Sequence, residues 1–255
     1  MNYIETEWNG YKCLEFEFQN RKAKLVFPKV PCEGNKWLLK TEYFGAFPAF
    51  ELEMLADGYH VAYVSNKTRW HDASDDDMKE AFCTFLQQEF GLNEKCLPVG
   101  MSCGGMHAVY FAAKYPKRIA GLYLDAPVLN LLSCPAGAGI AGDDMYEEFV
   151  RDTGLTKSDL INYRNHPIDC AAVLVKKRIP IFLVAGDSDS VVPYVENGKV
   201  LYEYYVEHGG DITQIVKKGC DHHPHGLANN ALLKEFVKRV YYLHANNALA
   251  VSPPR

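Results

Sequence analysis

A serine, an aspartate and a histidine, each placed after a short apolar run, are the residues of this chain best suited to chemistry. The serine is Ser102, at the centre of a Gly-x-Ser-x-Gly pattern at residues 100–104. A serine hydroxyl is a poor nucleophile at neutral pH and attacks a carbonyl carbon only when a nearby base accepts its proton. That base needs an acidic partner that fixes its tautomer. These residue types therefore suggest acyl transfer through a serine nucleophile.

The stretch around Ser102 predicts a sharp turn between a strand and a helix. The apolar run 96–99 favours a buried strand, and an alanine-rich helical pattern follows the glycines. A serine on such a turn projects its hydroxyl from the carboxyl edge of a sheet, where open α/β folds bind their ligands. Because Cys103 begins a helix, its backbone N–H has no helical acceptor and is predicted to hold a developing oxyanion. We expect Cys103 to contribute this N–H rather than its thiol.

Two later strands end in polar loops that supply a carboxylate and a histidine. The apolar run 179–185 leads into a Gly-Asp-Ser-Asp sequence at residues 186–189, and the last strand leads into the histidine-rich loop 220–225. The order serine, aspartate, histidine along the chain is that of the α/β-hydrolase arrangement. Asp189 is therefore the predicted acid and His222 the predicted base.

The rest of the chain predicts the elements that position these residues. An antiparallel start, followed by strands alternating with helices, predicts an α/β fold with a doubly wound, mostly parallel sheet. We expect eight strands, the first two forming an N-terminal hairpin at residues 11–18 and 21–27. Residues 128–166 have weak periodicity and are predicted as a small inserted helical cap within a single domain, 1–255. The last helix is expected from Leu227 to Leu243, and residues 251–255 as a loose tail.

Composition excludes several classes of function. The chain has 27 Lys and Arg against 32 Asp and Glu, a net charge of −5, without a basic block, so we expect neither nucleic acid nor an anionic membrane as a partner. No apolar run approaches the roughly 18 residues of a membrane span. The polar first ten residues do not resemble a signal peptide. Eight scattered cysteines without a Cys-x-x-Cys pair predict reduced thiols and a cytoplasmic location. The oligomeric state is left open.

The chain resembles the α/β-hydrolase superfamily over nearly its whole length. More narrowly, it resembles a poorly characterised bacterial subgroup of serine-esterase-like proteins with G-x-S-x-G-G and H-H-P-H motifs. The corresponding stretches here are Tyr43–Gly45, Gly100–Gly105, Asp125–Val128, Gly186–Pro193 and His222–Leu227. The resemblance implies that the last Asp of the Gly-x-x-Asp turn, Asp189, is the acid. The chain departs from the subgroup at Cys103, where an Arg is more frequent, and at Gly226, which replaces a Ser.

Alternatives remain for the acid and the base. Asp125, at the end of the strand after the nucleophile, is the rival acid, and its other expected role is to bind backbone amides at the cap entrance. His223 is the runner-up for the base, and His225 is expected to begin the closing helix. Three histidines and Asp221 within five residues would also suit a metal site, but neighbouring imidazoles on one loop rarely converge without other ligands. We therefore predict no metal ion and no cofactor.

The residues together predict a serine hydrolase, and we favour a carboxylesterase for a small acyl ester. The backbone N–H of Phe44, in the first loop, is predicted to be the second oxyanion donor beside Cys103. The resemblance makes an acyl ester of a sugar the first candidate substrate. Alternatives with the same triad are a peptidase, a thioesterase or a carbon–carbon hydrolase. An alternative of another class is a non-catalytic ligand-binding protein with this fold.

Overall fold

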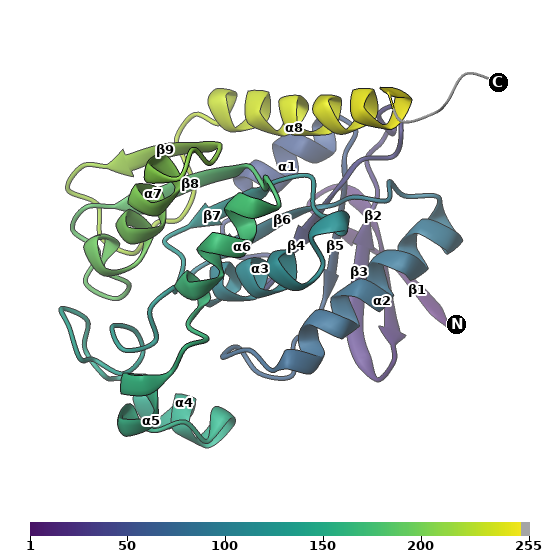
Figure 1. Ribbon diagram of the computed structural model, residues 1–255. Coiled ribbons are helices and arrows are strands. Elements are labelled where there is room, and N and C mark those ends of the chain that lie inside the picture. Colours follow the sequence, from purple (N-terminus) through teal and green to yellow (C-terminus); the bar gives the residue numbers. More distant parts are fainter. Residues whose placement is uncertain (251–255) are drawn as a thin grey trace.

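The computed structural model describes residues 1–250, with side chains through Leu243. Residues 251–255, predicted as a loose tail, lie outside the described part. One sheet runs through the molecule, with the strand order β1-β2-β3-β5-β4-β6-β7-β8-β9 (Figure 1). Its strands are β1 (Tyr3–Trp8), β2 (Tyr11–Phe18), β3 (Arg21–Val26), β4 (Trp37–Lys40), β5 (His60–Val64), β6 (Leu97–Met101), β7 (Leu122–Asp125), β8 (Ile181–Gly186) and β9 (Ile212–Lys217).

The predicted fold class is confirmed: β1, β2, β3 and β5 pair antiparallel, and all pairs from β5 through β9 are parallel. The sheet has nine strands rather than eight, and the additional one is β1. It pairs with β2 from Tyr3 opposite Phe16 to Trp8 opposite Tyr11. An edge strand with no fully buried residue can be largely polar, and for this reason its sequence has no apolar pattern that predicts a strand.

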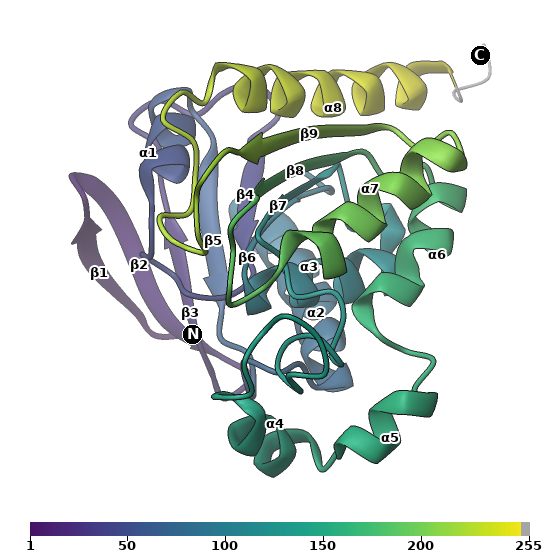
Figure 2. The same ribbon diagram turned by 90° about the vertical axis from the view of Figure 1, so that its left-hand side faces the viewer.

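Helices cover both faces of the sheet, so that two hydrophobic cores form. Helices α2, α3, α6 and α7 pack on one face, and α1 and α8 pack on the other (Figures 1 and 2). Successive residues of β8 alternate between the cores, with Leu183 in the first and Phe182 and Val184 in the second. The helices are α1 (Ala49–Ala56), α2 (Ala73–Phe90), α3 (Cys103–Lys114), α4 (Tyr146–Thr153), α5 (Lys157–Asn162), α6 (Ala171–Lys176), α7 (Gly198–Glu207) and α8 (Ala231–Ala250), with 3₁₀ turns η1 (Pro116–Arg118), η2 (Pro167–Cys170) and η3 (Tyr194–Glu196).

The last helix starts later than expected, at Ala231 instead of Leu227. The backbone N–H of Ala231 is capped by Oδ1 of Asn229 at 2.8 Å, and the preceding residues form an irregular loop in which Gly226 has φ 89°. His225 therefore lies in this loop and does not begin the helix. No helix within residues 1–250 is long and apolar enough to cross a membrane.

The two parts of the segment 128–166 have different contacts with the rest of the molecule. Its first part is bound to the chain after β8: Oδ1 of Asn197 accepts hydrogen bonds from the backbone N–H groups of Leu129 and Asn130, both at 2.9 Å. Glu196 likewise accepts hydrogen bonds from the Ser133 hydroxyl and from a backbone N–H of the same part.

The second part of this segment carries α4 and α5, which project from the end of the molecule opposite α8 (Figures 1 and 2). Helix α4 is held by the loop after β5. Arg69 of that loop makes a two-pronged ion pair with Glu148, at 2.6 and 2.5 Å, and Trp70 packs edge-on against Phe149. The segment predicted as a cap is thus irregular over residues 128–145 and helical in α4 and α5, and its two parts have different supports.

Candidate active site

Ser102 occupies a strained turn between β6 and α3, with φ 52° and ψ −122°. Two glycines make this geometry accessible. A side-chain carbon at Gly100 would lie 2.6 Å from the carbonyl oxygen of Gly104, and one at Gly105 would lie 2.3 Å from Cβ of Pro127. The glycine after the five-residue pattern, Gly105, is thus as restricted as Gly100, because the start of α3 passes directly beside Pro127, after the end of β7.

The three residues predicted to act together are adjacent in the structure. Nε2 of His222 lies 3.1 Å from Oγ of Ser102, and Nδ1 of His222 lies 2.8 Å from Oδ2 of Asp189. Both His222 and Asp189 are 5 % exposed. The other carboxylate oxygen of Asp189 accepts hydrogen bonds from the backbone N–H groups of Val191 at 2.9 Å and Val192 at 2.7 Å. These two hydrogen bonds fix the orientation of the carboxylate. The loop after β8 therefore holds Oδ2 of Asp189 facing His222.

The loops that carry the acid and the base are tied to each other. The backbone N–H of Ser190 donates to Asp221 at 2.8 Å. Gly186 lets the two loops approach, since a side-chain carbon there would lie 2.2 Å from the carbonyl oxygen of Cys220. Asp187, the other carboxylate of the acid loop, is exposed and accepts a hydrogen bond from the backbone N–H of Gly219. Asp187 thus supports the turn from outside.

Asp125, the rival acid, lies beside a different histidine. Its Oδ1 is 3.2 Å from Nδ1 of His225, and its Oδ2 accepts hydrogen bonds from the backbone N–H of Gly226 at 2.5 Å and from the Tyr123 hydroxyl at 3.1 Å. Asp125 was also expected to bind backbone amides at the cap entrance. It does bind one backbone amide, but this amide belongs to Gly226 of the histidine loop. The site therefore contains two carboxylate–imidazole pairs, and only the Asp189 pair reaches Ser102.

The two predicted oxyanion donors differ in their surroundings. Cys103 is the first residue of α3, so its N–H has no acceptor within the helix. Burial raises the pKa of its thiol to about 11, which keeps the sulfur protonated at neutral pH. The ring of Phe44 points into the core, with centroids 5.0 Å from Trp8 and 5.5 Å from Tyr63. Only the backbone of Phe44 can therefore serve the site.

A cavity of about 300 Å³ opens over Ser102. It is lined by Tyr43, Ala46, Phe47, Arg69, Met101, Ser102, Met145, Val191, His222, His223 and His225. Sequence reasoning missed Arg69, Met145 and Val191. Arg69 lies in a polar loop more than thirty residues before the nucleophile, and its only sequence signal was the neighbouring Trp70, a large apolar residue in a polar stretch.

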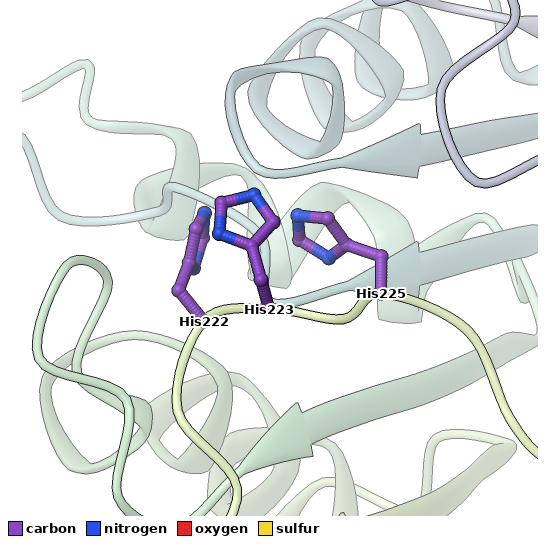
Figure 3. A group of neighbouring side chains, drawn as sticks. All are labelled: His222, His223 and His225. Atoms are coloured by element: carbon purple, nitrogen blue, oxygen red, sulfur yellow. The ribbon is translucent and has the colours of Figure 1, made fainter.

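The histidine loop is more compact than expected. One nitrogen from each of His222, His223 and His225 lies within 4.8 Å of the other two, and Figure 3 shows the three rings side by side on one loop. The expectation that neighbouring imidazoles would not converge is thus wrong for this loop. The ring of His223 stacks on Phe47 with centroids 5.5 Å apart.

The model of the prolyl oligopeptidase family of peptidases matches residues 57–248, three quarters of the chain and all three residues of the Ser–His–Asp set. The chain belongs to the prolyl oligopeptidase family. Its nine-stranded sheet, with an antiparallel start and parallel strands after it, has the α/β-hydrolase-like topology.

Solved structures with the same fold come from both peptidases and esterases. The acylaminoacyl peptidase of Pyrococcus horikoshii aligns with a TM-score of 0.67 and 15% identity over 92% of this chain and 42% of its own. The dipeptidyl peptidase 4 of Porphyromonas gingivalis aligns with a TM-score of 0.65 and 16% identity over 94% of this chain and 36% of its own. The S-formylglutathione hydrolase of Agrobacterium tumefaciens aligns with a TM-score of 0.61 and 17% identity over 96% of this chain and 99% of its own. This member of the family spans less than half the length of those two peptidase chains.

Proposed function

We propose that this protein hydrolyses small acyl esters with Ser102 as nucleophile, His222 as general base and Asp189 as the acid. The observation that carries the proposal is the continuous contact from Asp189 through His222 to Ser102, at 2.8 and 3.1 Å, on the wall of a cavity. Contacts of this length are those expected between a nucleophile, its base and the group that orients the base.

The proposed reaction follows from the atoms in contact. Asp189 accepts the Nδ1–H of His222, so the Nε2 lone pair faces Ser102. As Oγ attacks the ester carbonyl, Nε2 takes the hydroxyl proton and later gives it to the leaving alcohol. The backbone N–H groups of Cys103 and Phe44 are the proposed donors to the tetrahedral oxyanion. Water, activated by the same imidazole, then attacks the acyl-enzyme and releases the acid.

A small and uncharged acyl group suits the cavity. Its volume of about 300 Å³ is at the lower end for ligand pockets. Phe47, Met145 and Val191 give it apolar walls, and its cationic side chain, Arg69, is already paired with Glu148. The chain that aligns over its full length is named an S-formylglutathione hydrolase, which is compatible with a small acyl substrate, ester or thioester. An acyl group on a sugar, as the resemblance to the bacterial esterase subgroup implies, is one form of this class.

The second candidate function is hydrolysis of a peptide or acyl-amino acid bond. The family match favours it, since the family is named for an oligopeptidase and several chains with the same fold are peptidases. The triad chemistry would be the same, with an amine as leaving group in place of an alcohol.

Fluorophosphonate labelling tests the nucleophile. Wild type should be labelled, Ser102→Ala should not, and Ser188→Ala, an exposed serine of the acid loop, should label as wild type does. Equal labelling of wild type and Ser102→Ala would refute the proposal, and it would then favour a ligand-binding role without turnover.

Substrate series separate the two candidate functions. Turnover of p-nitrophenyl esters from acetate to decanoate should be highest for the short chains. Aminoacyl and dipeptidyl p-nitroanilides should be cleaved much more slowly. The opposite ranking would assign the protein to the peptidases of its family.

A cytoplasmic location is also proposed. It rests on the eight cysteines, all of which are free thiols in the structure, since disulfides are the rule for exported chains and rare in the cytoplasm. Immunodetection in cell fractions tests it, and recovery outside the cytoplasmic fraction would contradict it.

A further inference from the structure

Three imidazoles gather at the mouth of the cavity, and the proposed reaction uses only one of them. Nitrogens of His222, His223 and His225 lie within 4.8 Å of one another (Figure 3). The side chains of His222 and His225 are both buried, at 5 % and 4 % exposed, whereas His223 is an exposed residue, so the group is open to solvent on the side of His223. A tetrahedral ion with bonds of about 2.0–2.1 Å needs its nitrogen ligands about 3.4 Å apart. Binding an ion therefore requires the three nitrogens to move closer together than the 4.8 Å limit within which they lie, and the exposed ring of His223 has the most room to move.

Two of the rings are oriented as metal-bound histidines are. Nδ1 of His222 is held by Asp189 at 2.8 Å, and Nδ1 of His225 is held by Asp125 at 3.2 Å. In histidine metal sites a carboxylate usually binds the ring nitrogen that does not bind the metal, fixing the tautomer and making the other nitrogen more basic. Each carboxylate here leaves Nε2 of its histidine as the ligand atom.

The third ring is also a competent ligand. His223 is an exposed residue whose ring lies 4.8 Å from that of His222 and 5.1 Å from that of His225, between ring centroids. The stacking on Phe47 holds the ring beside the other two. Zn²⁺ favours uncharged imidazole ligands, and it binds them without any change in its oxidation state.

We propose that His222, His223 and His225 bind a Zn²⁺ ion through one nitrogen each, and that this ion inhibits the enzyme. The fourth position of the ion is left to water. Once the Nε2 lone pair of His222 is bound to Zn²⁺, it cannot accept the proton of Ser102. The binding site stands on its own geometry, whereas the inhibition rests on the proposed function.

Direct binding of Zn²⁺ tests the site without any need for turnover. Calorimetric titration of the full chain with Zn²⁺ should give one site, and Ser102→Ala should keep it. His223→Ala should weaken binding by at least about 10-fold, and Asp125→Asn by about 10- to 100-fold through the release of His225. His208→Ala, a change at an exposed histidine outside the cluster, is the matched control and should bind as wild type does.

The half-buried thiol of Cys220, two residues before His222, is the competing ligand. Cys220→Ser should retain the site if the histidines hold the ion. Loss of binding in Cys220→Ser, or unchanged binding in His223→Ala, would overturn the proposed site. Substitution of Co²⁺ provides a second readout, because its visible spectrum distinguishes nitrogen from thiolate ligands.

Inhibition is measured as p-nitrophenyl acetate turnover against free Zn²⁺ in a metal buffer. Turnover should fall in parallel with occupancy of the calorimetric site and return on addition of EDTA. The concentration for half inhibition, relative to each protein's own metal-free rate, should rise at least about 10-fold in His223→Ala. Full turnover of wild type at saturating Zn²⁺ would refute the inhibition. If the protein binds Zn²⁺ but hydrolyses no ester even when the metal is absent, the proposed function is refuted instead.

Discussion

The change Asp189→Asn should abolish most turnover, because the surroundings of position 189 decide which way the amide faces. One carboxylate oxygen of Asp189 accepts two backbone N–H groups, from Val191 at 2.9 Å and Val192 at 2.7 Å. An asparagine must keep its carbonyl oxygen at these two donors, so its NH₂ group is directed at Nδ1 of His222. His222 then has to accept at Nδ1 and carry its proton on Nε2. In this tautomer the ring cannot accept the proton of Ser102.

The size of the effect follows from the loss of the general base. An inverted tautomer of this kind reduces kcat by about 10⁴-fold in the Ser–His–Asp proteases in which it is known. At 1.36 kcal/mol for each factor of ten, this corresponds to about 5.4 kcal/mol of the activation barrier. The same change at Asp125 would invert only His225, which does not contact Ser102, so Asp125→Asn should retain turnover within about 10-fold of wild type.

Single-turnover and steady-state hydrolysis of p-nitrophenyl acetate, measured on both variants, tests this reasoning. Folding is checked by urea unfolding, because Asp189 is buried. Full turnover in Asp189→Asn, combined with a loss of about 10⁴-fold in Asp125→Asn, would transfer the acid to Asp125. Equal losses in both variants would mean that the two carboxylate–imidazole pairs act as one unit.

Two further predictions concern stability. Gly105→Ala places a methyl group 2.3 Å from Cβ of Pro127 and should lower the free energy of unfolding by about 3 kcal/mol, whereas Gly142→Ala, with its nearest contact at 3.7 Å, should change it by less than about 0.5 kcal/mol. Equal urea midpoints for the two would contradict the close approach of α3 to Pro127. Burial lowers the pKa of His60 from 6.5 to about 4, so its stabilising contribution is complete above pH 6.5 and is lost as the pH falls toward 4. Between about pH 7.5 and pH 5 wild type should therefore lose about 2 kcal/mol more unfolding free energy than His60→Gln, and identical pH profiles would exclude this role.

The sequence was most informative where backbone chemistry restricts the choice of residue. A side chain at Gly100, Gly105 or Gly186 would make contacts below 3.0 Å, so these motif positions accept only glycine, and the motifs bring the predicted serine and aspartate close to His222. Alternating strands and helices sufficed for the fold class, because both faces of a parallel sheet must be covered. The choice between Asp125 and Asp189 was not accessible in the same way. Both aspartates end or follow a strand, and only the path of the histidine loop decides which imidazole each one meets.

Features that depend on long-range packing were missed for identifiable reasons. Strand β1 buries too little of its surface to have an apolar pattern. Arg69 is held at the cavity wall by Glu148, which lies 79 residues away in the sequence. Glu148 is on a helix whose position the sequence does not specify, so this contact could not be predicted. The convergence of three imidazoles depends on the irregular turn through Gly226, which no periodicity describes.

The divided support of the segment 128–166 has a consequence for how such an enzyme can change its substrate. Its first part is hydrogen-bonded to Asn197 and Glu196, in the stretch that follows the acid loop, so we expect substitutions there to disturb the support of that loop. Helix α4 instead contacts the β5 loop, through the ion pair of Glu148 with Arg69. Directed evolution confined to α4 is therefore expected to alter the cavity wall at Arg69 while the hydrogen bonds of Asn197 and Glu196 after the acid loop stay in place.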